Sequence, residues 1–140
     1  MNASKQMSPS QPASRLTKVE TVLRVLLGAF LAFGSLNFWF HLVPEPEMPL
    51  AAQNFFSALA QTGYFLPLLK ATELLVAIAL LANHFVPLAL VVLAPITVNI
   101  VLFHVVLAPA ELAAALILLT LHLGLAWSRR QSYRELLRSR

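Results

Sequence analysis

The chain contains no cysteine, and charged residues make up only 11% of its 140 residues. Without thiols, the protein has no disulfides, thiol catalysis, cysteine-ligated zinc or iron–sulfur clusters. A soluble domain normally needs about a quarter charged residues to cover its surface. Here 59% of the residues are hydrophobic, and lipid can cover such a surface where water cannot. The composition therefore predicts an integral membrane protein.

Four long apolar runs supply the expected membrane spans, at residues 22–43, 64–82, 85–107 and 110–127. A helix needs about 20 apolar residues to cross roughly 30 Å of hydrocarbon, and it satisfies its own backbone hydrogen bonds there. The connections at residues 83–84 and 108–109 are very short, which forces neighbouring helices to run antiparallel. We therefore expect an all-α fold, an antiparallel four-helix bundle in the membrane formed by residues 21–128.

Three segments lie outside these spans. Residues 1–20 have no apolar period and predict a disordered cytoplasmic tail, and residues 129–140 form a basic cytoplasmic tail. Within the proline-containing loop 44–63, Phe55, Phe56 and Leu59 recur at helical spacing. This spacing favours a short helix over residues 51–60 in the membrane interface, with a packed loop as the alternative.

Lysine and arginine are absent from the connections between the spans. Basic residues flank the first and last spans instead: Lys5, Arg15, Lys18, Arg24, Arg129, Arg130, Arg134, Arg138 and Arg140. By the positive-inside rule, both termini are cytoplasmic, which agrees with an even number of spans. Cytoplasmic anchoring also explains the net charge of +4 without a nucleic-acid partner. Since no organellar targeting segment is evident, we expect a multi-pass protein of the bacterial inner membrane.

The second span carries two ionisable residues, Lys70 and Glu73, which are neighbours on a helix and can form an ion pair. Each charge inside hydrocarbon costs roughly 2.5–3.5 kcal/mol on insertion scales. The pair could lock the helices together, or it could handle a proton or a ligand. A buried pair seldom repays its own desolvation, so we favour the functional interpretation.

Polar residues on the first and third spans fall at similar depth. Asn37 and His41 share a face of the first span with Gly34, whose missing side chain should allow another helix to approach. On the third span, His104 shares a face with Thr97, whereas Asn99 points away from both. With the inferred topology, Glu73 lies near mid-membrane and the others lie in its outer half. We expect a ligand pocket between the first three spans, formed by Asn37, His41, Lys70, Glu73, Asn99 and His104.

Histidines offer little support for a metal or haem. His41 and His104 lie at similar depth on different spans, the minimum for bis-histidine ligation, but no HxxxH pair accompanies them. His122 is expected to make an isolated hydrogen bond, and His84 is a turn residue. Nucleophile elbows, phosphate loops and dinucleotide fingerprints are absent. We expect no metal site and no independent catalytic activity.

Two strings carry a family resemblance: TGYFLPLLKATE at residues 62–73, and PLAL at 87–90 leading to APITVNIVLFH at 94–104. With the Gly28, Gly34 and Asn37 pattern before them, residues 23–133 resemble the DoxX-like membrane proteins. The resemblance implies a four-helix membrane bundle and marks Lys70, Glu73, Asn99 and His104 as motif positions. The family name derives from a subunit of a quinone-linked sulfur oxidation system.

Three functions follow as hypotheses. The first is an accessory protein of a quinone-linked or oxidative-stress redox system that binds a lipophilic ligand, with a quinone as the candidate cofactor. The second is a structural or assembly module that recruits a membrane protein partner or a further copy of itself. The third is a small proton-coupled transporter, although no inverted repeat is evident.

Overall fold

The computed structural model describes the backbone of residues 12–44 and 46–137, and the side chains from residue 17 to residue 133 of these. Six α-helices and one 3-10 turn follow one another: α1 (Pro12–Phe40), α2 (Leu50–Gln61), α3 (Phe65–Leu81), α4 (Val86–Val106), η1 (Pro109–Glu111), α5 (Leu112–Ser128) and α6 (Arg130–Leu137). No strand occurs in this described part. The expected all-α fold class is confirmed.

Three helical segments are long and apolar enough to cross a membrane: Thr17–Phe40 within α1, Val86–Val106, and Pro109–Ser128. The 17 residues of α3 are too few alone, but α2 and α3 together pass the same test, with a bend of 93° between them. The described residues therefore contain three to four helices that could span a membrane. The loop helix predicted for residues 51–60 is present as α2.

The first helix begins earlier than predicted. It starts at Pro12, so the expected disorder of residues 1–20 is wrong for residues 12–20, and residues 1–11 lie outside the described part. Proline is tolerated in a first helical turn, where its missing N–H has no partner to lose. Helix formers between Pro12 and the first span then let the helix extend beyond the hydrocarbon.

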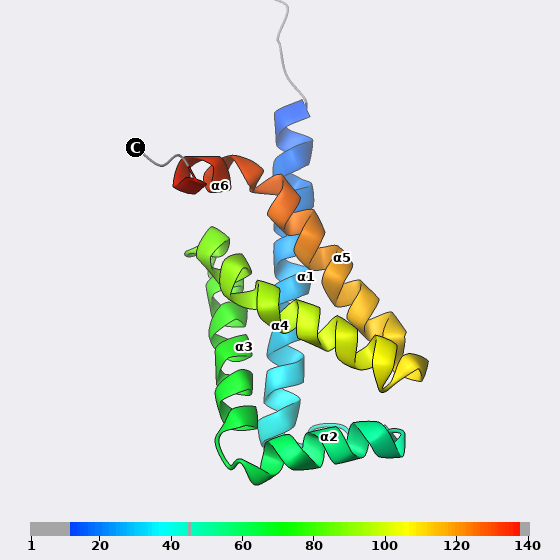
Figure 1. The fold of residues 1–140 in the computed structure, drawn as a ribbon. Helices are drawn as coiled ribbons and strands as arrows, with labels where there is room; N and C mark the ends of the chain where they lie inside the picture. The colour runs from blue at the N-terminus through cyan, green and yellow to red at the C-terminus, as the bar shows by residue number, and fades with distance from the viewer. Residues whose placement is uncertain (1–11, 45, 138–140) are drawn as a thin grey trace, which may run out of the picture.

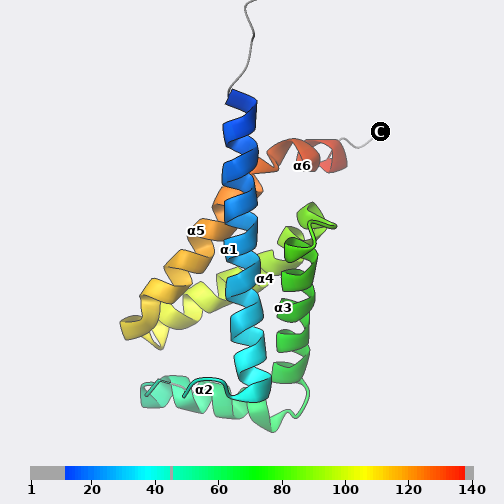
Figure 2. The ribbon, with the colours of Figure 1, turned by 180° about the vertical axis from the view of Figure 1, so that it is seen from behind.

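Successive long helices reverse direction along the chain (Figures 1 and 2). Helices α1 and α3 lie side by side, whereas α4 is inclined to both, and α5 returns beside α4. Helix α2 lies across the end of the molecule opposite α6. The α3–α4 turn is tight enough to place Asn83 and Phe85 in the left-handed region, with φ of 57° and 52°. Asparagine adopts this region readily and phenylalanine does not.

Leucine and valine side chains from α1, α3, α4 and α5 form the core, including Leu27, Leu80, Leu93 and Leu125. At Gly28, α1 packs tightly against α3, because a Cβ there would lie 2.9 Å from Leu81 Cγ. The outer faces stay apolar, as lipid contact requires.

One end of the molecule is held together by arginines. Arg24 of α1 donates hydrogen bonds to the carbonyls of Leu80 and Leu81, at the C-terminal end of α3. Arg129, just after α5, pairs with Glu20 of α1 and donates to the Asn83 side chain at 3.3 Å. These contacts join α1, α5 and the α3–α4 turn beside α6.

Candidate functional site

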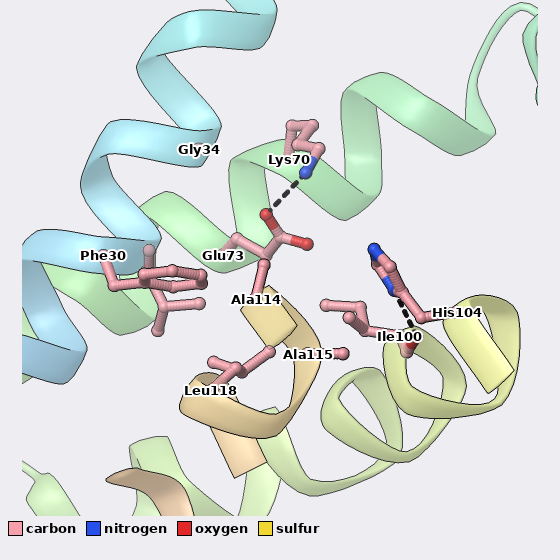
Figure 3. Close-up of a pocket in the computed structure, with 10 residues that line it drawn as sticks. Phe30, Gly34, Lys70, Glu73, Ile100, His104, Ala114, Ala115 and Leu118 are labelled. Atoms are coloured by element: carbon pink, nitrogen blue, oxygen red, sulfur yellow. Dashed lines mark hydrogen bonds and ion pairs between the residues drawn. The ribbon is translucent and has the colours of Figure 1, made fainter. Parts of the chain in front are cut away.

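A small pocket lies where α1, α3, α4 and α5 meet (Figure 3). Its volume is about 130 Å³, and its lining consists of Phe30, Leu31, Gly34, Lys70, Glu73, Ile100, His104, Ala114, Ala115 and Leu118. Six of these ten residues have apolar side chains, Gly34 has none, and the polar ones are Lys70, Glu73 and His104. The pocket thus combines an apolar wall with two ionisable groups from α3 and one from α4.

The predicted ion pair is present. Lys70 Nζ donates to Glu73 Oε2 at 2.9 Å, with side-chain exposures of 23% for Lys70 and 4% for Glu73. The second carboxylate oxygen, Glu73 Oε1, is buried and has no hydrogen-bond partner among the described residues. A buried oxygen without a donor is costly, and more so on a charged group. The ion pair therefore satisfies only half of the carboxylate.

His104 faces this unpaired oxygen. Its Nδ1 lies 2.8 Å from the Ile100 carbonyl, and since a carbonyl only accepts, Nδ1 carries the proton and donates. The other ring nitrogen, Nε2, is directed across the pocket toward Glu73 (Figure 3). No hydrogen bond joins His104 to Glu73, so a polar group placed between them could contact both.

Gly34 acts differently from the prediction. A Cβ at Gly34 would meet no atom within 4 Å, so no helix approaches closely there. The missing side chain instead leaves part of the pocket empty. The close helix contact expected at Gly34 lies two turns earlier, at Gly28.

Three of the six predicted site residues come together, namely Lys70, Glu73 and His104. The other three do not line the pocket. Asn37 Oδ1 accepts a hydrogen bond from the Val43 backbone N–H at 2.8 Å, beyond the end of α1. His41 is exposed in the same segment with a φ of 50°, and Asn99 is exposed on the outer face of α4.

The sequence prediction missed the contribution of α5. The pocket was expected between the first three spans, yet Ala114, Ala115 and Leu118 form one of its walls. The run of alanines at residues 113–115 is the signal that could have indicated it, because small side chains leave space between helices. Ser35, fully buried with an unpartnered Oγ, was also not anticipated.

His122 makes the isolated hydrogen bond that was predicted. Its Nδ1 lies 2.8 Å from Thr97 Oγ1, and both side chains are buried between α4 and α5. Thr97 is thereby engaged away from the pocket. Across the described residues, His, Asp and Glu side chains nowhere gather in a group of three that could hold a metal ion.

Comparisons with protein-family models, with curated proteins and with solved structures each found no match to this chain.

Proposed function

We propose that this chain is a DoxX-like, four-span protein of the bacterial inner membrane whose pocket holds the head group of a lipophilic quinone or quinol. It would serve a quinone-linked or oxidative-stress redox system as a binding component without catalysis of its own. The basic residues at both chain ends support a cytoplasmic location for both termini. The reversal of successive helices supports an antiparallel bundle in which α3 is the fourth span.

The observation that carries this proposal is the pair of unmatched polar atoms facing one another across the pocket. Glu73 Oε1 has no donor, and His104 Nε2 is directed toward it. A quinol hydroxyl placed between them would donate to Glu73 Oε1. Because Nδ1 of His104 donates to the Ile100 carbonyl, Nε2 is also an acceptor and offers the quinol hydroxyl a second hydrogen-bonding position. Lys70 compensates the charge of the carboxylate through its other oxygen.

The size of the pocket limits the ligand. A volume of about 130 Å³ is smaller than the ~300–1,000 Å³ of typical ligand pockets. An engineered apolar cavity of about 150 Å³ binds benzene, so this pocket has room for about one ring, and ring substituents would extend beyond it. Because Phe30 and Ala114 in the lining are themselves exposed on the lipid-facing side, an isoprenoid tail could leave the pocket into lipid.

We test this with the chain in nanodiscs, by titrating a short-chain quinol and by extracting co-purified lipids for mass spectrometry. Glu73→Gln keeps the shape of the side chain but removes the charged acceptor, and should weaken quinol binding about 10- to 100-fold. Glu111→Gln is the matched control, since Glu111 lies in η1 and outside the pocket, and should bind like the parent.

A second variant removes space instead of charge. Gly34→Leu should project into the pocket and reduce quinol binding at least 10-fold, while Gly34→Ala should have a smaller effect. Phospholipid as the sole extracted molecule, with quinol binding unchanged in Glu73→Gln and Gly34→Leu, would overturn the proposal. That result would favour the structural or assembly role.

A further inference from the structure

Asn99 is the polar residue of α4 that neither the pocket nor the core uses. Its side chain is exposed, on the face of α4 that points away from the other helices, and it forms no hydrogen bond within the described residues. His104 and Ile100, by contrast, line the pocket from the inner side of the same helix. Asn99 therefore presents an unmatched amide to whatever surrounds the protein.

In a membrane, this amide cannot reach water. Asn99 lies seven residues before the last residue of α4, Val106, which is roughly 10 Å along the helix axis. The short side chain of asparagine cannot span that distance, whereas lysine and arginine can snorkel. An amide left in hydrocarbon without a partner costs several kcal/mol. The position therefore calls for a hydrogen-bonding partner from outside the chain.

The neighbours of Asn99 form one continuous stripe along α4. We call these residues the α4 stripe: Leu88, Val92, Pro95, Asn99, Leu102 and Val106. Their spacing alternates between four and three, which places all six on one face of the helix. All six are exposed, and the four leucine and valine side chains range from 39% for Val92 to 70% for Val106. The one polar member lies within an otherwise apolar seam.

We propose that the α4 stripe is a dimer interface, covered by the α4 stripe of a second copy of this chain, with the two Asn99 amides hydrogen-bonded to one another. An amide carries both donor and acceptor, so two identical amides satisfy each other across a two-fold axis. Two copies inserted in the same orientation place Asn99 at the same depth. A different protein would need its own polar group at that depth.

The arrangement of α4 suits such a contact. Because α4 is inclined to α1 and α3 (Figures 1 and 2), two copies related by an axis normal to the membrane would cross. A crossing at Asn99 would bring Pro95 and Leu102 into the contact and leave the two ends of the α4 stripe further apart. No residue of the α4 stripe lines the pocket, so dimerisation leaves that site open.

Disulfide cross-linking tests the interface directly, because the chain has no native cysteine. Leu102→Cys lies on the stripe, and Val105→Cys is the control of similar exposure, 53% against 55%, whose side chain lies to one flank of the stripe. In oxidised native membranes, Leu102→Cys should give a linked dimer at a several-fold higher yield than Val105→Cys. Equal yields, or more dimer from Val105→Cys, would overturn the proposed interface.

The role of the amide is tested in the same background. Adding Asn99→Leu should weaken dimerisation about 3- to 30-fold, whereas Asn99→Gln should retain most of it. Mass measurements in nanodiscs and thermal unfolding would accompany the cross-linking, since an exposed leucine should leave the monomer folded. Unchanged dimerisation by Asn99→Leu, or a parent chain that stays monomeric, contradicts the proposal. Normal quinol binding by Asn99→Leu would keep this test separate from that of the pocket.

Discussion

A carboxylate within a hydrocarbon span needs donors for both of its oxygens, and Lys70 supplies one for only one oxygen of Glu73. The remaining oxygen faces a small cavity and a histidine nitrogen, not apolar packing. A purely structural salt bridge would gain from having all its acceptors satisfied. The half-satisfied carboxylate is the single-residue feature that most favours ligand binding over a structural lock.

The ion pair predicts that a double variant is more stable than one of the single variants it contains. Lys70→Met should destabilise the protein by about 1–3 kcal/mol, because it leaves a buried carboxylate without its donor. Lys70→Met combined with Glu73→Gln should be more stable than Lys70→Met alone, since no unpaired charge remains. Unfolding in mixed detergent micelles would measure both variants. A double variant less stable than Lys70→Met would show that charge burial is not what Lys70 relieves.

Only some of the pocket residues could be predicted from the sequence. Lys70, Glu73 and His104 could be placed together because their types are rare in hydrocarbon and their depths agree. Asn37 could not, because its hydrogen bond to the Val43 backbone depends on how the chain leaves α1. His41 adopts a left-handed backbone in that same exit and turns into the exposed segment.

At the scale of elements, two glycines of α1 that look alike in sequence do opposite things. Gly28 brings α1 against Leu81 and the Ala77 carbonyl of α3, and Gly34 leaves the pocket open. The apolar runs of the sequence predicted the positions of the helices. The observed bounds of α3, α4 and α5 follow these runs closely. The steep inclination of α4 and the role of α5 in the pocket depend on long-range packing, which no local pattern encodes.

Alanine at each glycine should therefore change stability in opposite directions. Gly28→Ala should destabilise the protein by about 1 kcal/mol net, because displacing the Leu81 side chain from the new methyl costs more than the helix propensity gained. Gly34→Ala should stabilise it by about 0.5–1 kcal/mol, through helix propensity in open space. Denaturation of the two variants under identical detergent conditions provides the comparison, and equal shifts would contradict the packing described for α1.

At the scale of the whole molecule, the two ends differ in chemistry. One end gathers Arg24, Arg129 and Glu20 beside α6, and the other carries α2 across it. Positive charge at the first of these ends sets the proposed orientation. Helix α2 then lies on the opposite side of the membrane.

Cysteine labelling in intact bacteria measures this orientation. Glu47→Cys, exposed in the loop before α2, should react with a membrane-impermeant maleimide from outside. Gln131→Cys, exposed in α6, should react only after the membrane is opened. The reverse pattern would invert the topology, and labelling of both sites from outside would mean an odd number of spans.

The contact between Arg24 and the end of α3 also has a consequence for biogenesis. The arginine precedes its acceptor carbonyl in Leu80 by 56 residues. At translation rates of about 5–20 residues per second, roughly 3–11 seconds pass before that carbonyl is even synthesised. During this interval the nascent first helix has a guanidinium near the end that we propose to be cytoplasmic, with neither carbonyl available. We expect that group to stay in water until α3 has been synthesised, so that α1 reaches its final depth only after α3 has emerged.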